Sequence, residues 1–408
     1  MLIPSIDLMA GKAVQLIGGK EKVLEVDDVL GLARRFRVYG EIAVIDLDAA
    51  MGRGDNLGLI KQICQIAQCR VGGGIRESQK AEELLRAGAR RLIIGTAANE
   101  DFLSRFPKNR VMVAVDHWDG TLLSHGWLQD EKEAPLERMK RLAPLCGGFL
   151  VTQVHREGRL GGVDFEAARA LRAWVPNEIV YAGGVTSAEE VAKLDKLGLD
   201  AQVGMALYTG RLDPAEAFVA CLDFSKANGM LASVVQDPAG RLRMVAWQTP
   251  ESLRQALRTG RGVFYSRSRN SLWVKGETSG HTQKLLLAQP DCDRDVVRFT
   301  VKQQGPSCHT GADTCFGPAE FRLEDLEQII CSRKENPLPG SYTARLFQEP
   351  DFLDAKLQEE VKEVLEAGDR PDDLVWECAD LIYFLMVKMV AGGVTWNQVL
   401  NELDRRRK

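Results

Sequence analysis

The chain of 408 residues is long enough for about three domains at the usual size of roughly 100 to 200 residues each. Its hydrophobic fraction of 45% and charged fraction of 27% are typical of a globular protein, and a net charge of -4 gives no reason to expect a nucleic-acid partner. The longest apolar stretch near the end, residues 381–387, is too short to cross a membrane. Nine cysteines without framework spacing, and a start that lacks a secretory signal, favour a cytoplasmic location.

The first 225 residues contain an internal repeat. Asp7 and Asp116 each end an apolar run and lie 109 positions apart, and the same number separates Gly95 from Gly204. Two glycine-rich segments, GGGI and AGGV, lie 110 positions apart. Three agreements at nearly one offset indicate two similar halves rather than chance.

Apolar runs in this region alternate with amphipathic segments of helical length, such as Leu57–Ile66 and 188–197. The runs cover residues 2–7, 42–47, 92–94, 111–115, 149–154, 179–182 and 200–203. Such alternation predicts parallel strands with crossover helices, and two similar halves predict a (β/α)8 TIM barrel over residues 1–226. Polar groups at the C-terminal ends of its strands would then form the active site.

Each half of the repeat supplies one aspartate and two glycine-rich turns. Because glycine lets backbone amides approach an anion closely, each half is predicted to hold one phosphate. The predicted phosphate-binding residues are Gly73, Gly74, Gly95, Thr96, Gly183, Gly184 and Gly204. Asp7 and Asp116 would face the middle of a substrate with two phosphates, where paired carboxylates suit a proton-shuttling isomerisation. The alternative is that the glycines only make tight turns; the repeated set favours phosphate binding.

Residues 1 to about 225 resemble the phosphoribosylformimino-aminoimidazole-carboxamide ribotide isomerases of histidine biosynthesis. The segments that carry the resemblance are IDLMAGKAVQL (6–16), DLDAA (46–50), GGGIR (72–76), IIGTAA (93–98), YAGGVTS (181–187) and VGMALYTGR (203–211). The resemblance implies that Asp7 and Asp116 are the acid/base pair of an Amadori rearrangement. The chain departs from many relatives at HREGR (155–159) and at Gln15, where arginine is usual. A barrel that has lost its chemistry and serves as a scaffold is the alternative.

A second region, residues 231–317, follows a polar linker at 225–229 and has a shorter periodicity. Six strand-like segments begin near residues 233, 242, 262, 271, 284 and 296. Proline opens one helix, Pro250–Thr259. This pattern predicts a small β-rich α+β domain, in which Arg267, Arg269 and Lys275 are candidate phosphate ligands.

The end of this region gathers carboxylates and thiols in DCDRD (291–295), CHTG (308–311) and DTCF (313–316). If DCDRD is an extended strand, Asp291, Asp293 and Asp295 share one face and Cys292 lies on the other. Oxygen ligands suit magnesium, whereas Cys292, Cys308 and Cys315 are the soft ligands that zinc prefers. The segment therefore predicts a site for metal-assisted hydrolysis.

Two histidines lie near this segment. His281 sits in the turn GETSGH, where a structural role is the alternative to a catalytic one. His309 adjoins Cys308, so it is either a proton-transfer group or a support for a metal ligand.

The region resembles the phosphoribosyl-AMP cyclohydrolases along its length, through QD (236–237), SRSR (266–269), LWVKGETSGH (272–281), DCDRD and CHTGADTCF (308–316). The resemblance implies that zinc held by Cys292, Cys308 and Cys315 activates a water that opens the adenine ring. It also implies magnesium at Asp291, Asp293 and Asp295, and a homodimer, because the zinc ligands come from two subunits. A disulfide between Cys308 and Cys315 is the weaker alternative.

Residues 318–408 are predicted to form an all-α domain. In residues 353–367 the apolar positions fall on one helical stripe, and Glu360 lies on that stripe with Glu363 close by. Glu377 and Asp380 interrupt the apolar helix that follows. Burying four unpaired carboxylates would cost several kcal/mol each, which indicates a bound magnesium ion on two antiparallel helices.

This last region resembles the phosphoribosyl-ATP pyrophosphohydrolases, through SYTARL (341–346), KLQEEVKEVLEA (356–367) and ECADLIYFL (377–385). The resemblance implies a magnesium-bound water that attacks the triphosphate of an ATP-derived nucleotide, with Lys356 near the phosphates. Phe384 stands where relatives commonly have histidine, and we expect activity to survive this difference. Glu359 and Glu366 are expected to belong to a solvated acidic face.

Together the three resemblances name consecutive steps on phosphoribosyl nucleotides. They predict a trifunctional enzyme of histidine biosynthesis that needs zinc and magnesium. The alternative is a bifunctional cyclohydrolase and pyrophosphohydrolase with a silent barrel, and a purely structural protein is a third possibility, against which the complete ligand sets weigh.

Overall fold

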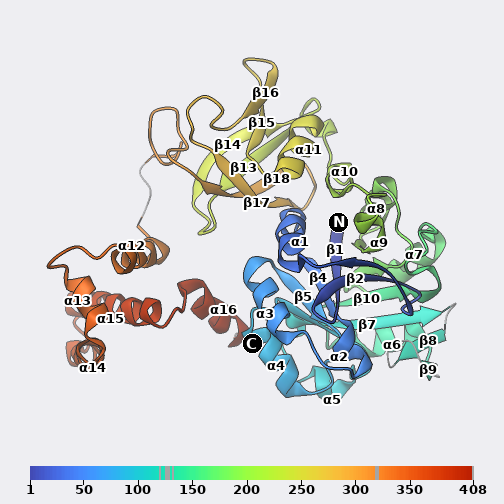
Figure 1. Ribbon diagram of the computed structural model, residues 1–408, viewed down its shortest axis with the longest axis horizontal. Helices are drawn as coiled ribbons and strands as arrows, with labels where there is room; N and C mark the ends of the chain where they lie inside the picture. The colour runs from blue at the N-terminus through green and yellow to red at the C-terminus, as the bar shows by residue number, and fades with distance from the viewer. Residues whose placement is uncertain (119–120, 125–128, 131–132, 318–320, 407–408) are drawn as a thin grey trace. The chain divides into compact units, whose positions relative to one another are not determined.

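The computed structural model describes residues 1–118, 121–124, 129–130, 133–317 and 321–406, which form two compact units, Met1–Pro318 and Ala319–Lys408 (Figure 1). The predicted domain start at Pro318 lies outside the described residues, and the boundary between 226 and 231 stays a prediction. Within the described ranges, no helix combines the length and apolar character that a bilayer crossing requires.

The first part of the larger unit is a closed ring of eight parallel strands. In order around the ring these are β1 (Leu2–Met9), β4 (Ile42–Asp46), β5 (Cys69–Gly72), β6 (Arg91–Ile94), β7 (Val111–Trp118), β10 (Gly148–Gln153), β11 (Glu178–Ala182) and β12 (Asp200–Val203). Ring closure is made by β12 and β1, where Leu2 pairs with Ala201. The predicted TIM barrel is confirmed.

The sequence analysis did not predict one barrel strand, β5. Its sequence CRVG contains Arg70, so it does not read as an apolar run. Arg70 is nonetheless buried, because its guanidinium pairs with the carboxylates of Glu41 and Glu178 at the N-terminal end of the barrel. A charged residue in a buried strand is tolerated when it is paired in this way.

Helices and short hairpins connect the barrel strands. The helices are α1 (Val29–Phe36), α2 (Leu47–Met51), α3 (Leu57–Ile66), α4 (Ser78–Arg86), α5 (Glu100–Leu103), α6 (Pro135–Leu142), α7 (Phe165–Trp174), α8 (Ala188–Lys196), α9 (Met205–Tyr208) and α10 (Pro214–Ala220). The hairpin strands are β2 (Lys12–Ile17), β3 (Glu21–Val26), β8 (Thr121–Ser124) and β9 (Gln129–Asp130). The predicted helix at 57–66 is α3, and the one predicted at 188–197 ends one residue earlier.

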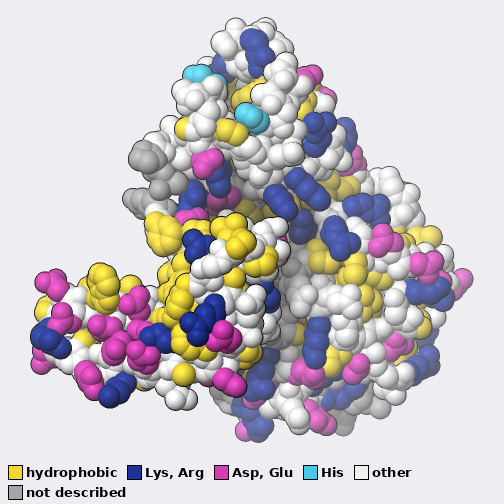
Figure 2. Space-filling view, turned by 60° about the vertical axis from the view of Figure 1, so that its left-hand side comes forward, with side chains coloured by type: hydrophobic (Ala, Val, Ile, Leu, Met, Phe, Trp, Pro, Cys, Tyr) yellow, Lys and Arg dark blue, Asp and Glu magenta, His cyan; other side chains and the backbone are white. Residues whose placement is uncertain are grey.

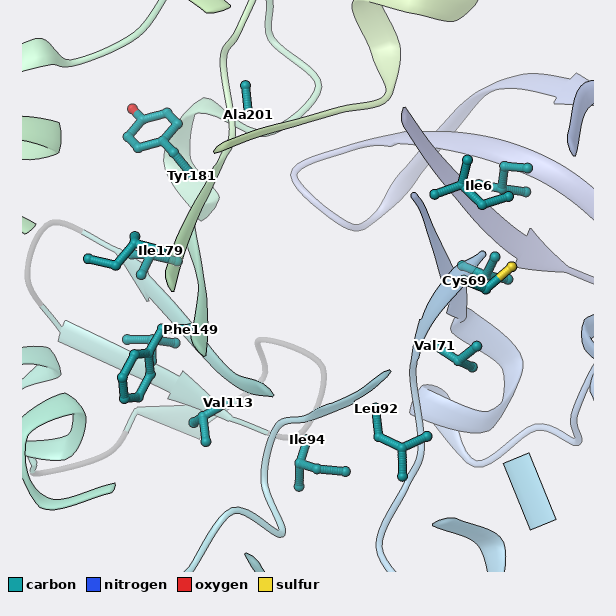
Figure 3. Packing of buried hydrophobic residues seen from close by; sticks show 14 of the residues in the cluster. Ile6, Cys69, Val71, Leu92, Ile94, Val113, Phe149, Ile179, Tyr181 and Ala201 are labelled. Carbon is teal, nitrogen blue, oxygen red and sulfur yellow. The ribbon is translucent and has the colours of Figure 1, made fainter. Parts of the chain in front are cut away.

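Alternation along the strands separates two layers of core. Leu92 and Ile94 pack outward against the helices, as do the labelled residues of the neighbouring strands in Figure 3, whereas Ile93 between them belongs to the cluster inside the barrel. Phe149 and Tyr181 are among the largest fully buried side chains of the outer layer. Burial of one such side chain stabilises the fold by roughly 1.5–3 kcal/mol.

A second sheet follows the barrel, with one helix, α11 (Pro250–Thr259), packed on it, as predicted. Its strands, in spatial order, are β16 (Ser271–Val274), β15 (Val263–Ser266), β14 (Leu242–Gln248), β13 (Leu231–Gln236), β18 (Val296–Gln303) and β17 (Gln283–Pro290). The small β-rich α+β domain is confirmed.

This sheet and the barrel share one hydrophobic core. Tyr39, which precedes β4, and Phe218 of α10 pack in the same cluster as Leu257 and Phe299 of the second region. The barrel contributes from the N-terminal ends of its strands, because Tyr39 lies just before one of them. The sheet therefore leaves the opposite, C-terminal face of the barrel free for a site.

The smaller unit is helical, as predicted. It consists of α12 (Leu323–Glu335), α13 (Tyr342–Gln348), α14 (Pro350–Ala367), α15 (Pro371–Ala391) and α16 (Trp396–Arg406), with α14 packed along α15. Leu353 of the predicted apolar stripe is buried, but Leu365 is 76% exposed, as is Trp376 to 70%. Hydrophobic and acidic side chains accordingly lie close together on this unit, at the lower left of Figure 2.

Candidate functional site

A cavity of about 220 Å³ opens among the C-terminal ends of the barrel strands. Asp7 of β1, Asp116 of β7 and Glu157, which follows β10, all line it. The two predicted aspartates thus lie in one cavity. Glu157 is a third carboxyl group that the sequence analysis recorded only as part of the departure HREGR.

The pKa values of two of these carboxyl groups are displaced upward. Burial raises the pKa of Asp7 to about 6, although Ser5 Oγ donates a hydrogen bond to its Oδ1 at 2.9 Å, which opposes the shift. Burial, together with the negative charges of Asp7 and Asp116, raises the pKa of Glu157 to about 8. At neutral pH the cavity therefore holds an ionised Asp7 and a protonated Glu157, so that it contains both a proton acceptor and a proton donor.

The glycine turns of the two halves have matching backbones. Gly73 and Gly74 have φ of 96° and 66°, and Gly183 and Gly184 have φ of 97° and 87°. A Cβ at Gly73 would lie 2.2 Å from the backbone oxygen of Asp46. Tight packing alone thus requires glycine here, as in the alternative interpretation of these turns.

The same glycines nevertheless line open space. Gly73, Gly74, Gly95 and Thr96 border the main cavity, and a smaller adjoining pocket of about 20 Å³ is bordered by Gly183, Gly184 and Gly204. Glu157 borders both. The arrangement has the form expected for one anion site in each half, with carboxyl groups between them.

Gln15 fills the position where relatives usually have arginine. It is 1% exposed, its Nε2 donates to the Val14 carbonyl at 3.0 Å, and its side chain lies against Gly204. A neutral amide therefore stands next to one glycine turn, and no cationic charge is supplied there by this residue.

In the second region the acidic segment is a turn, not the extended strand considered from sequence. Residues 291–295 connect β17 to β18, and Arg294 adopts φ of 66° in the left-handed region. The turn still gathers Asp291, Asp293 and Asp295, whose ligand oxygens lie within 4.8 Å of one another. Lys226 Nζ lies 2.6 Å from Asp293 and 3.1 Å from Asp295, so a positive charge is already favoured at this position.

Two of the three predicted zinc ligands lie together. Cys308 and Cys315 interact through their side chains, and Thr310 Oγ1 donates to Cys308 Sγ at 3.1 Å. Hydrogen bonds from Thr310 lower the pKa of Cys308, which favours the thiolate that binds metal. Both cysteines are free thiols, contrary to the alternative of a disulfide.

Cys292 does not join them within one chain. It is exposed, and its Sγ lies 4.0 Å from Asp293 Oδ1. Among the described residues, no group of three ligand atoms within 4.8 Å contains a cysteine. A single subunit therefore presents two thiols in one place and the third apart from them.

Lys275 lies near the thiol pair, and Arg267 of the same region is held against an aromatic ring. Lys275 is 7% exposed, and burial lowers its pKa against the opposing effect of Cys315 and Cys308. Arg267 lies over the Trp247 ring at 4.3 Å. Arginines held in this way present their guanidinium edges to an anion.

The remaining candidates of the second region lie in its loops. Arg269 lies 5.9 Å from the Trp273 ring centroid. His309 is exposed with Nδ1 3.8 Å from Cys308 Sγ, which leaves both of its predicted roles open. The His281 ring packs so closely on Gly305 that an added Cβ there would lie 2.7 Å from its Cδ2, which supports at least a structural role.

Carboxylates of the helical unit converge between α14 and α15. Ligand oxygens of Glu360, Glu363 and Glu377 lie within 4.8 Å of one another, and Glu360 is only 4% exposed. Burial raises the pKa of Glu360, Lys356 opposes the shift, and the charges of Glu363 and Asp380 add to it. The four predicted acidic residues thus form one electrostatic cluster, of the oxygen-rich type that suits a hard divalent cation.

Neighbouring residues of this cluster match their expected places. Lys356 Nζ lies 2.7 Å from Glu359 and 3.5 Å from Glu360. Phe384 is buried and makes edge-to-face contacts with Tyr342 and Tyr383, so it serves the core. The expected solvent exposure of Glu359 and Glu366 is confirmed.

Three family models match the chain in succession. A family described as "Histidine biosynthesis protein" matches residues 1–213, "Phosphoribosyl-AMP cyclohydrolase" matches residues 244–317, and "Phosphoribosyl-ATP pyrophosphohydrolase" matches residues 323–407. The order agrees with the three resemblances predicted from the sequence.

Curated relatives are of two kinds. The histidine biosynthesis trifunctional protein of Saccharomyces bayanus is 37% identical over 231 residues, which are 56% of this chain and 29% of that protein. The histidine biosynthesis bifunctional protein HisIE of Pyrococcus furiosus is 38% identical over 201 residues, which are 46% of this chain and 96% of that protein. The corresponding HisIE of Caldanaerobacter subterraneus is 42% identical over 192 residues, 44% of this chain and 94% of that protein. The chain thus spans less than a third of the length of the trifunctional relative.

Proposed function

Because the chain belongs to the histidine biosynthesis protein family, with cyclohydrolase and pyrophosphohydrolase domains after its barrel, we propose that it catalyses three consecutive steps on phosphoribosyl nucleotides. Phosphoribosyl-ATP is hydrolysed to phosphoribosyl-AMP and pyrophosphate, the adenine ring is opened by water, and the resulting aminoaldose is isomerised to an aminoketose. The observation that carries this proposal is the succession of three matched regions in one chain.

In the barrel, Asp7 and Asp116 act as the acid/base pair. With a pKa of about 6, Asp7 is ionised at neutral pH and accepts a proton from the sugar carbon. Glu157 lies in the same cavity with a pKa of about 8 and keeps a proton there, which limits the repulsion between the three carboxyl groups. The glycine turns at Gly73 and Gly183 hold the two terminal phosphates through backbone amides.

In the second region, Cys308 and Cys315 hold zinc together with Cys292 of the partner subunit. The separation of Cys292 from the two other thiols within one chain supports this homodimer. Zinc, when bound, supplies an activated water for ring opening. Arg267, Arg269 and Lys275 bind the phosphates, and His309 or His281 moves the proton that ring opening requires.

In the helical unit, Glu360, Glu363, Glu377 and Asp380 hold magnesium, and Lys356 lies near the triphosphate of the ATP moiety. Magnesium, when bound, supplies the water that attacks the phosphate chain. Burial, together with the negative charges of neighbouring carboxylates, raises the pKa values of Glu360 and Glu377, which supports a cation between them. Phe384 replaces a side chain that is no ligand, so turnover is retained. A cytoplasmic location stays a prediction from the cysteine usage.

The isomerase step decides between the trifunctional proposal and a silent barrel. Purified protein is supplied with the ring-opened aminoaldose, and formation of the aminoketose is followed by chromatography. We expect turnover by the wild type and a loss of about 10²–10⁴-fold in Asp7→Asn, the usual contribution of one acid or base. Asp101→Asn, which changes an 83% exposed side chain of the same barrel, serves as the matched control.

Lack of turnover by the wild type, with both hydrolase activities present, would favour the bifunctional alternative. In that case the barrel is a binding or dimerisation module, and the assignment of the metal sites in the other two regions is unaffected.

A further inference from the structure

The acidic turn of the second region, residues 291–295, is attached to the barrel through one of its own residues, Arg294. Arg294 lies between Asp293 and Asp295 in sequence, yet its side chain extends to α8 of the barrel. Its Nε donates to Asp195 Oδ2 at 3.1 Å and its Nη2 donates to Asp195 Oδ1 at 2.8 Å. Such two-pronged contacts fix orientation as well as distance.

Asp195 is well placed to act as an anchor. Its side chain is only 10% exposed, and Oδ1 also accepts a hydrogen bond from the Met1 amine at 2.8 Å. A mostly buried carboxylate that accepts hydrogen bonds from two residues is far less mobile than a carboxylate on the exposed surface. The position of Arg294 is therefore set by the barrel.

The backbone of Arg294 is held as well. Its φ of 66° lies in the left-handed region, which a non-glycine residue adopts only where the surroundings enforce it. Its carbonyl accepts from the Asp223 amide at 2.8 Å, and its Nη1 donates to the Asp291 carbonyl at 3.1 Å. The turn is thus bonded on one side to the barrel's C-terminal segment and on the other to its own first aspartate.

A second contact comes from the segment that leaves the barrel. Lys226 pairs with Asp293 and Asp295, so the turn receives one cation from the linker while its arginine is directed away to Asp195. Because the Arg294 guanidinium pairs with Asp195, it does not pair with the neighbouring carboxylates of Asp293 and Asp295. The guanidinium therefore does not compete for the three aspartates, and an added cation has only to displace the Lys226 ammonium from two of them.

We propose that Asp195, acting through Arg294, is a positioning residue with which the barrel sets the divalent-cation affinity of the acidic turn in the neighbouring domain. The inference rests on the magnesium site that the sequence predicts at Asp291, Asp293 and Asp295, whose ligand oxygens lie within 4.8 Å of one another.

The test measures Mn²⁺ binding by the full chain, from the loss of the electron paramagnetic resonance signal of free Mn²⁺. All proteins carry Glu377→Gln, which weakens the separate carboxylate cluster of the helical unit. Asp195→Asn removes the charge of the anchor, and Arg294→Lys keeps a positive charge but loses the two-pronged contact. We expect each to weaken Mn²⁺ binding about 10-fold, as loss of a residue that orients metal ligands usually does.

A matched control changes the same interface without touching the turn. Arg258 of α11 pairs with Asp213 and Glu216 beside and within α10, so Arg258→Ala weakens the contact between barrel and sheet elsewhere. We expect it to lower the unfolding temperature and leave Mn²⁺ affinity within twofold of the parent protein. Asp195→Glu, which retains the carboxylate, should recover most of the lost affinity.

Two results would overturn the proposal, and they differ in scope. If the parent protein binds Mn²⁺ and both Asp195→Asn and Arg294→Lys bind it equally well, the anchor is only structural while the metal site stands. If the parent protein binds no Mn²⁺, or binds it as well when Asp293→Asn is added, the proposed magnesium site is wrong and the positioning role falls with it.

Discussion

Carboxyl groups crowd together in the barrel cavity and between α14 and α15, but the two surroundings differ. In the barrel, Glu157 lies beside Asp7 and Asp116 in a cavity that shields it from water, and its pKa rises to about 8. In the helical unit, Glu360 is buried, whereas Glu363 and Glu377 are half-buried. Repulsion is relieved by a retained proton in the first case, whereas a dissolved cation can reach the second.

The difference has a chemical consequence. A carboxyl group that keeps its proton at neutral pH can donate it to a substrate, so the barrel cluster suits isomerisation. A cluster that remains ionised and accessible attracts a divalent ion, which suits hydrolysis by activated water. We therefore expect one residue type, in groups of similar size, to serve two kinds of catalysis.

The largest expected difference between the two clusters is their response to chelation. After dialysis against EDTA, we expect both hydrolase activities to fall about 10²-fold or more, because metal ions contribute several kcal/mol to such steps. Isomerase turnover should remain, since no grouped metal ligands of the described residues lie in the barrel. Each activity is measured separately with its own substrate, and Mg²⁺ and Zn²⁺ are then added back.

Hydrolysis that persists after chelation, with no metal found by elemental analysis, would contradict the distinction between the clusters. Loss of isomerase activity on chelation, with recovery when metal is added back, would also contradict this distinction between the clusters.

A smaller effect is expected in the pH dependence of the barrel. Isomerase kcat/KM should rise as Asp7 ionises near pH 6 and fall as Glu157 loses its proton near pH 8. In Glu157→Gln the alkaline fall should disappear while the acid limb stays. The measurement is a pH–rate profile of both proteins between pH 5 and 9.

Stability should change over a related range. Because the pKa of Glu157 is raised in the folded protein, it contributes stability that is present below its unfolded value of about 4.5 and is lost as pH rises through about 8. Glu157→Gln should therefore unfold at a higher temperature than the wild type at pH 9. An unchanged alkaline limb together with unchanged stability would show that Glu157 is ionised throughout.

Sequence patterns were sufficient for the barrel and for the grouping of several acidic residues, because both depend on local order. The repeat placed Asp7 and Asp116 at equivalent strand ends, and both line one cavity. Four carboxylates at helical spacing predicted a cluster on two helices, and the side chains of Glu360, Glu363 and Glu377 meet there.

What could not be predicted depends on tertiary contacts. The protonation of Glu157 follows from its burial next to two aspartates far away in sequence, for which the sequence gives no signal. An extended strand at 291–295 was excluded by the left-handed turn at Arg294, which a partner in the barrel holds. The shared core around Phe218 was equally hidden, because interface residues such as this one resemble any other apolar core residue.

A further effect separates the clusters when metal is absent. Glu360 has a raised pKa, so metal-free protein should lose stability in the helical unit as pH rises and Glu360 ionises. Glu360→Gln should then raise the free energy of local opening in α14 and α15 by about 1 kcal/mol at pH 7.5. The increase is measured as slower hydrogen exchange. In excess Mg²⁺ the wild type should instead exchange more slowly than the variant, because only the wild type gains the full binding energy of the ion. Glu366→Gln on the exposed face of the same helix is the control.

The smallest effect on activity is expected at Phe384. Its substitution tests whether this residue belongs to the core of the helical unit and not to the metal ligands. Phe384→His introduces the side chain that relatives commonly carry, but Phe384 is buried against Tyr342 and Tyr383. We expect pyrophosphohydrolase kcat to change less than threefold, while stability falls by about 1–3 kcal/mol because a polar ring replaces an apolar one. Steady-state kinetics and thermal unfolding of the same samples measure the two quantities. A gain in kcat of tenfold or more would show that the phenylalanine has cost this chain part of its hydrolytic chemistry, and that the carboxylate cluster alone does not account for turnover.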